Sequence, residues 1–136
     1  MSFSPASRNW TTEILPTKAA VTYTAGMMLY NDATDNVPTV AAAQQNIKGI
    51  AKEAVASAAT TTSIAVLVPL SASSTFYGDM VSGETITSAG VGDQFDFSST
   101  GLTISTTSTY DAVTLVKFIS SSKGIFKLNL TTGIEN

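Results

Sequence analysis

The side chains of this chain that are able to perform acid–base chemistry are mainly carboxylates. The 136 residues include no histidine and no cysteine, and among the ten acidic residues the only close pair on a predicted rigid element is Asp93 with Asp96. A pair of carboxylates hydrolyses glycosides when both face one sugar from opposite sides. Asp93 falls in a predicted turn. Asp96 alternates with Phe95 and Phe97, so the Asp96 side chain points to the opposite face of the strand and is expected in solvent. We therefore do not expect the pair to form a catalytic site.

A serine nucleophile would need a lysine as its base, because histidine is absent. Lys52 and Lys117 are the candidates, but strand alternation places both side chains on the surface. Glu53 and Glu84 are isolated in the sequence. We predict that the protein is not an enzyme. A hydrolase stays as a third hypothesis, which requires carboxylates to converge in the folded chain.

Metal and cofactor chemistry also lacks its usual ligands. Without cysteine and histidine there is no thiolate or imidazole ligand and no disulfide framework. The turn at 31–36 resembles a calcium-binding loop faintly, but Ala33 stands where a ligand is needed and Asn36 replaces the turn glycine. We predict neither a metal nor a cofactor.

Charge and hydropathy argue against two classes of partner. The net charge is -3 and the basic residues are dispersed, whereas nucleic-acid binding needs clustered positive charge. The longest apolar run, 64–68, is too short to cross a membrane, and residues 1–5 lack the features of a signal peptide. We expect no nucleic-acid partner and no membrane association.

Composition predicts an all-β fold. Charged residues make up 12% of the chain, and 17 Ser and 21 Thr supply most of its polarity. Threonine is β-branched and favours strands. Turn residues recur about every 8–12 positions, which is typical of a sandwich or barrel. We expect one small β-barrel or β-sandwich.

Strands are expected over 24–30, 47–51 and 64–69, which together form the frame of this domain. Within the frame, Gly26 and Gly49 are expected to serve backbone shape. Two other segments have weaker signals. Residues 18–23 alternate like a strand, and 41–46 favours one or two helical turns, so at most one short helix is expected.

Residues 1–18 show no period of 2 or 3.6, so we expect an extended N-terminal arm in front of a domain at 19–136. Two interpretations of the arm stay open. Its aromatic residues either cap the core of the domain or contact a partner, because tryptophan and arginine are enriched at interfaces. The candidates for partner contact are Phe3, Arg8, Trp10 and Ile14.

Carbohydrate binding is a competing hypothesis for a β-domain of this kind. Exposed aromatic rings can stack on sugars, and the chain offers five candidates. They are Trp10, Tyr23, Tyr30, Tyr77 and Tyr110. Because they do not recur at a spacing that forms a platform on one strand face, packing in the core or at its edges is the simpler interpretation.

The order of motifs between residues 19 and 70 resembles a known family. Residues 25–29 (AGMML) are followed by a polar turn and an Ala-rich linker, then by 47–54 (IKGIAKEA). A Thr-rich hairpin leads to 64–69 (IAVLVP). This arrangement is similar to the small capsid decoration, or cement, proteins of tailed bacteriophages. The rest of the chain shares only the composition of that family.

The resemblance implies a β-domain, commonly a homotrimer, on the outer face of a capsid, with an arm that reaches onto the shell or a neighbouring copy. The expected function is that of a virion structural protein that bridges major capsid protein subunits and stabilises the shell. The alternative is a phage fibre or a carbohydrate- or receptor-binding β-module. Under the first hypothesis, deleting residues 1–15 should leave a folded domain that no longer binds capsids.

Overall fold

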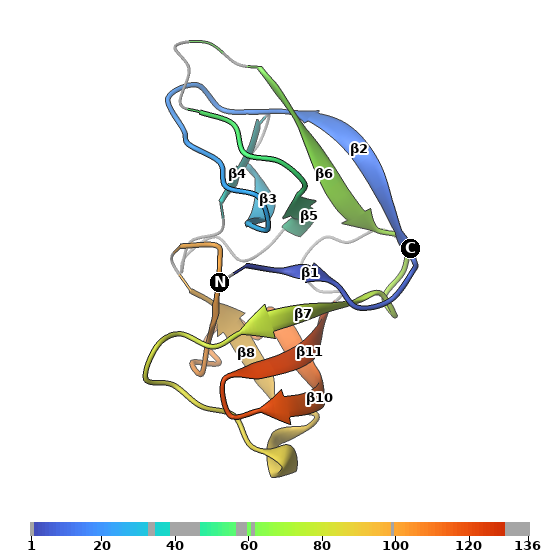
Figure 1. Cartoon of the computed structure of the whole chain (residues 1–136), viewed down its shortest axis with the longest axis vertical. Helices are drawn as coiled ribbons and strands as arrows, with labels where there is room; N and C mark the ends of the chain where they lie inside the picture. The colour runs from blue at the N-terminus through green and yellow to red at the C-terminus, as the bar shows by residue number, and fades with distance from the viewer. Residues whose placement is uncertain are drawn as a thin grey trace.

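β-Strands form nearly all of the regular structure, and they assemble into two sheets with antiparallel neighbours (Figure 1). The computed structural model describes residues 2–32, 35–38, 47–56, 60, 62–98 and 100–129. Its elements are β1 (Ser4–Pro5), β2 (Trp10–Pro16), β3 (Met28–Asp32), β4 (Asp35–Pro38), β5 (Ile47–Ala51), β6 (Ser63–Pro69), β7 (Thr75–Asp79), the 3-10 turn η1 (Ser88–Gly90), β8 (Gln94–Phe97), β9 (Ile104–Ser105), β10 (Val113–Ser120) and β11 (Lys123–Leu128). The predicted all-β class is confirmed.

Five strands of the N-terminal half form one sheet in the order β2-β6-β5-β3-β4. β2 pairs with β6 along all seven of its residues. The sheet curls, so that β2 also comes close to β4 at the other end of the strand order. Of the frame predicted over 24–30, 47–51 and 64–69, the second and third segments are present as β5 and β6, and β2 extends the sheet as an edge strand. The first segment is a strand only from Met28, where β3 begins, because the chain turns at Ala25 and Gly26.

Two glycines near this sheet occupy positions that a side chain could not share. A Cβ atom on Gly49 would lie 2.1 Å from the carbonyl oxygen of Leu67 on the neighbouring strand. Gly26 has a φ of 85°, and a Cβ atom there would lie 2.3 Å from the Cβ atom of Ser2. Both glycines therefore serve backbone shape, as the sequence predicted.

The second sheet has six strands in the order β1-β7-β11-β10-β8-β9. Its central hairpin, β10–β11, contains two shifts of register, at which Val116 and Ile119 of β10 have no counterpart on β11. Such bulges add a residue to one strand and change the direction of its side chains. Val116 is 40% exposed and Ile119 is 44% exposed, so both apolar side chains lie on the surface.

The main hydrophobic core lies between the two sheets and is rich in phenylalanine. Phe76 of β7 is edge-on to Phe3, with ring centroids 5.4 Å apart, and edge-on to Trp10 at 6.4 Å. Side chains of β3 and β5 contribute to this core from the five-stranded sheet. A second, smaller cluster around Tyr23 and Leu29 packs on the other side of that sheet.

The N-terminal residues are extended, as expected, and they join both sheets. Figure 1 shows β1 running between the two groups of strands. Phe3 is 2% exposed, and its amide donates to the Gly26 carbonyl oxygen at 2.8 Å. Trp10 is half-buried, and its indole nitrogen donates to the Thr75 carbonyl oxygen at 3.0 Å. Both aromatic rings therefore pack on the core of their own domain, which is the first of the two interpretations of the N-terminal arm.

Two connections between the sheets, at residues 6–9 and 70–74, lie side by side. The carbonyl oxygen of Asn9 accepts hydrogen bonds from the Leu70 amide at 2.9 Å and from the Ser74 hydroxyl at 2.7 Å. The side-chain amide of Asn9 donates to the hydroxyl of Ser71 in the connection at 70–74. These bonds fix the N-terminal segment to the middle of the chain.

The weaker signals of the sequence lie at 18–23 and 41–46. The strand pattern at 18–23 was misleading, because the chain turns there with Ala20 at a φ of 64°, and only an isolated bridge between Tyr23 and Val55 follows. The alternation at 18–23 comes from the burial of single side chains and not from pairing in a strand ladder. The helical turns expected at 41–46 lie outside the described residues.

Candidate functional site

A hydroxyl-rich loop, residues 106–112, joins β9 to β10. β8 pairs with β10 through Gln94 and Phe95, and with β9 through Asp96 and Phe97. Because β8 lies between these two strands, the loop that joins them has to pass across β8. The first five residues of the loop all carry hydroxyl groups. Two carboxylates hold its backbone in place.

Asp96 is the inner anchor of the loop. Its side chain is 3% exposed, and each of its oxygens accepts two hydrogen bonds. Oδ1 accepts from the backbone amides of Tyr110 and Asp111, both at 2.9 Å. Oδ2 accepts from the amide of Thr109 at 3.1 Å and from the hydroxyl of Thr107 at 3.0 Å. Four donors satisfy both oxygens, which makes the burial of this carboxylate tolerable.

The prediction that Asp96 is solvated was wrong. Phe95 and Phe97 are buried in the core, as expected, but the opposite face of β8 is covered by the loop. Strand alternation gives the face on which a side chain lies, and it does not show what covers that face. Asp93 is exposed at the start of β8, so the two carboxylates suggested by the sequence do not face a common ligand.

Glu84 is the outer anchor of the same loop. Its Oε1 accepts from the amide of Thr106 at 2.5 Å, from the Thr106 hydroxyl at 2.8 Å and from the Ser105 hydroxyl at 3.3 Å. The backbone hydrogen bond from Thr106 contributes most to lowering the pKa of Glu84 below 4.5, and the two hydroxyl bonds add to it against a small opposing effect of burial. The ionised carboxyl group therefore holds the first turn of the loop.

The contribution of Glu84 to stability is expected to depend on pH. Because folding lowers its pKa, the contribution is present above pH 4.5 and is lost as the pH falls through the lowered value. Glu84→Gln should lower the free energy of unfolding at pH 7 by up to about 1 kcal/mol, because the site is largely solvated. Urea titrations from pH 7 to pH 3 should show this difference shrinking at the acid end. A difference that is constant with pH would contradict the role of the ionised form.

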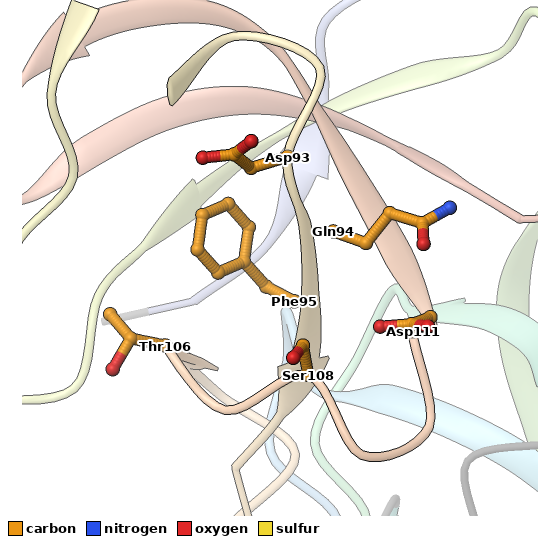
Figure 2. Close-up of a pocket in the computed structure, with 6 residues that line it drawn as sticks. All are labelled: Asp93, Gln94, Phe95, Thr106, Ser108 and Asp111. Atoms are coloured by element: carbon orange, nitrogen blue, oxygen red, sulfur yellow. The ribbon is translucent and has the colours of Figure 1, made fainter. Parts of the chain in front are cut away.

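An open pocket of about 450 Å³ lies beside the loop and the first residues of β8 (Figure 2). It is lined by Asp93, Gln94, Phe95, Thr106, Ser108 and Asp111. In Figure 2 the ring of Phe95 lies between Asp93 and Thr106, and Gln94 extends from the other side of β8. The lining thus combines two carboxylates, an amide, two hydroxyl groups and one aromatic ring.

The position of Asp111 is set by its backbone. Its φ is 52°, in the left-handed region, which aspartate tolerates better than most residues. Its amide donates to Asp96, and its carbonyl oxygen accepts from the side-chain amide of Asn129. The Asn129 side chain also accepts from the Thr114 hydroxyl at 2.6 Å. Asp111 is therefore held at the pocket by Asp96 of β8 and by Asn129, the residue that follows β11.

The other candidate residues lie apart from this pocket. Lys52 and Lys117 are exposed, as expected. Glu53 accepts a hydrogen bond from the Ala65 amide at 2.8 Å, so it supports β6. Of the residues expected to contact a partner, Arg8 is exposed and Ile14 is 67% exposed on β2, whereas Phe3 and Trp10 pack on the core.

The five aromatic residues considered for sugar binding do not share one surface. Tyr23 is 1% exposed, and its hydroxyl oxygen accepts from the Lys18 amide at 2.9 Å. Tyr77 lies on β7 with the Lys123 amine 5.9 Å from its ring centroid. Tyr110 is 40% exposed and belongs to the loop described above. They therefore form no common platform in the part of the chain that the structure describes.

The sequence interpretation missed Glu84, Thr106 and Asp111 as members of one site. Their positions depend on how the loop crosses β8, which is a tertiary feature. One signal was available: five consecutive hydroxyl residues before Asp111 are unusual for a strand connection and favour side-chain and backbone hydrogen bonding.

Comparisons with known proteins add no family. No protein-family profile matches the chain, and no curated protein is significantly similar to it in sequence. Within the described residues, no three acidic side chains gather where they could hold a metal ion, and no helix has the length and hydropathy of a membrane span. The geometry of the chain itself therefore carries the functional argument.

Proposed function

We propose that this chain is a virion structural protein that decorates the outer surface of a bacteriophage capsid and stabilises it by bridging major capsid protein subunits. Its resemblance to decoration proteins at residues 25–29, 47–54 and 64–69 supports this function, and these residues contribute to β3, β5 and β6 of one sheet. A homotrimer located in the virion belongs to the same proposal. Many weak contacts made by a symmetric assembly suit such a role.

The observation that carries the proposal is the exposed side chain of Ile14. β2 is the edge strand of the five-stranded sheet, with β6 as its neighbour, and Ile14 is 67% exposed on it. An edge strand offers backbone groups for pairing, and an apolar side chain there adds contact area. Arg8 precedes the strand and is also exposed. Both residues are available to a capsid, whereas Phe3 and Trp10 are used within the domain.

The deletion of residues 1–15 suggested by the sequence would be an ambiguous test of this proposal. Deletion of residues 1–15 would remove Phe3 from the core and most of β2 from its sheet, so lost binding would also follow from lost folding. Surface substitutions avoid this ambiguity. They remove a contact and leave the core and the strand pairing unchanged.

Ile14→Ser is expected to weaken binding to capsids of the same phage by tenfold or more. Burial of an isoleucine side chain contributes about 1.5–3 kcal/mol, and a tenfold change corresponds to about 1.4 kcal/mol. Co-sedimentation with purified capsids that lack the protein measures the affinity, and sedimentation of the free protein gives its oligomeric state.

The matched control is Ile119→Ser, which changes an isoleucine that is 44% exposed on the other sheet. It should bind as the natural protein does, and both variants should unfold at the same urea concentration as that protein. Equal capsid binding by Ile14→Ser and the natural protein would show that β2 is not the contact surface. No binding by the natural protein would count against the proposed function as a whole.

A further inference from the structure

The pocket beside the loop contains polar side chains that the fold does not use. In the part of the chain that the structure describes, the side chains of Asp93, Gln94, Ser108 and Asp111 form no hydrogen bond and no ion pair. This sets them apart from the neighbouring Asp96, whose two carboxylate oxygens each accept two hydrogen bonds, and from Glu84, whose Oε1 accepts three. Four uncommitted polar groups therefore line one hollow of about 450 Å³, within the usual range of ligand pockets of about 300–1,000 Å³.

The walls of this pocket are already fixed in position. The loop side is held by four hydrogen bonds to Asp96 and two to Glu84. The β8 side is held by pairing with β10 and by Phe95, which is 8% exposed and belongs to the core. A ligand that binds here would not have to order the loop first, and this saves part of the entropy cost of binding.

The mixture of groups in the pocket points to the kind of ligand. Two carboxylates accept hydrogen bonds only, whereas the amide of Gln94 and the hydroxyl of Ser108 both donate and accept. A sugar ring carries several hydroxyl groups that also donate and accept, and its apolar C–H groups suit contact with the small accessible part of the Phe95 ring. With two carboxylates and no cation among the lining residues, the pocket would repel an acidic sugar.

We propose that the pocket formed by Asp93, Gln94, Phe95, Ser108 and Asp111 binds a saccharide unit that has no acidic group (Figure 2). The site is distinct from the aromatic set that the sequence suggested for sugars, because Tyr23, Tyr30 and Tyr77 do not line it. It also lies on the six-stranded sheet, away from Ile14 on β2. Sugar binding and capsid binding are therefore separate properties and can be tested separately.

Titration by amide NMR of the full chain tests this proposal. The probes are the methyl glycosides of glucose, galactose and mannose, N-acetylglucosamine and, as the acidic sugar, sialic acid. Single sugars bind weakly, so each is added up to about 50 mM. At least one neutral sugar should shift the amide signals of Gln94, Thr106, Ser108 and Asp111 with saturation, and sialic acid should shift none of them.

Two variants identify the groups that bind. Asp93→Asn and Asp111→Asn keep the size of the side chain, and asparagine also tolerates the positive φ of position 111. Each should weaken the binding of the neutral sugar by about tenfold, because a neutral acceptor forms weaker hydrogen bonds than a carboxylate. The control Asp79→Asn changes a carboxylate on β7 that does not line the pocket, and its affinity should be unchanged.

Three results would overturn the proposal. The first is the absence of saturable shifts with every neutral sugar, and the second is that the shifts map to residues outside the pocket. The third is an affinity that neither Asp93→Asn nor Asp111→Asn changes. Amide spectra of each variant without sugar show whether it is folded, and Asp93→Asn, at an exposed position, provides the test if Asp111→Asn disturbs the loop.

Discussion

Phe3→Ala is expected to lower the free energy of unfolding by about 3–5 kcal/mol, the range typical of a buried phenylalanine. The Phe3 side chain is 2% exposed, and its ring is edge-on to Phe76 at 5.4 Å and to Phe97 at 5.5 Å. Its removal leaves a cavity between the two sheets that the surrounding rings cannot fill. Guanidinium unfolding followed by tryptophan fluorescence measures the change, since Trp10 contacts the same cluster.

Arg8→Ala is the control for this experiment, because Arg8 is exposed and the change should stay within about 0.5 kcal/mol. Phe3→Leu keeps most of the apolar volume and should fall between the two. A loss below about 1 kcal/mol for Phe3→Ala would contradict the buried position of the ring. It would instead favour the interpretation in which the N-terminal aromatic residues are available to a partner.

Asp96→Ala is expected to destabilise the protein by about 3–5 kcal/mol and to release the loop at 106–112. The change leaves three backbone amides and one hydroxyl without their acceptor in a place that water reaches poorly. Hydrogen exchange at the amides of Thr109, Tyr110 and Asp111 should accelerate more than exchange in β6. Unfolding in guanidinium gives the total effect.

Asp96→Asn and Asp93→Asn provide the comparison. Asparagine at position 96 keeps one acceptor oxygen but turns an NH2 group toward donors, so its cost should be lower than that of alanine and still above 1 kcal/mol or so. Asp93 is exposed, and its side chain forms no hydrogen bond to any residue that the structure describes, so its replacement should have little effect on stability. Equal stability of the two asparagine variants would show that Asp96 does not anchor the loop.

The strands with the clearest patterns were predictable from the sequence. The β-branched and apolar run at 64–69 became β6, and the alternation of Phe95 with Phe97 correctly placed both rings in the core. Gly49 was also correctly interpreted, because a glycine in a strand indicates close approach of another chain segment. These features depend on local preferences and on the period of the strand.

Features that depend on distant segments were not predictable. β2 was missed because its sequence, WTTEILP, does not alternate between polar and apolar residues, although its side chains alternate in exposure over residues 12–16. Its structure comes from pairing with β6, about fifty residues later. The burial of Asp96 likewise depends on the loop that follows the next strand, β9, and no pattern within β8 predicts it. The pocket consists of residues from both segments, which explains why it could not be assembled from the sequence.

The pairing of the N-terminal strands has a consequence for the order of folding. β1 pairs with β7 and β2 with β6, so these two strands lack their pairing partners until residues 63–79 have been synthesised. At about 5–20 residues per second, the ribosome needs roughly 3–13 s to make residues 17–79. During this time Phe3 and Trp10 are exposed on a nascent chain. Newly made protein is therefore most vulnerable to chaperone capture and aggregation through its N-terminus, although this segment ends in the core of the finished domain.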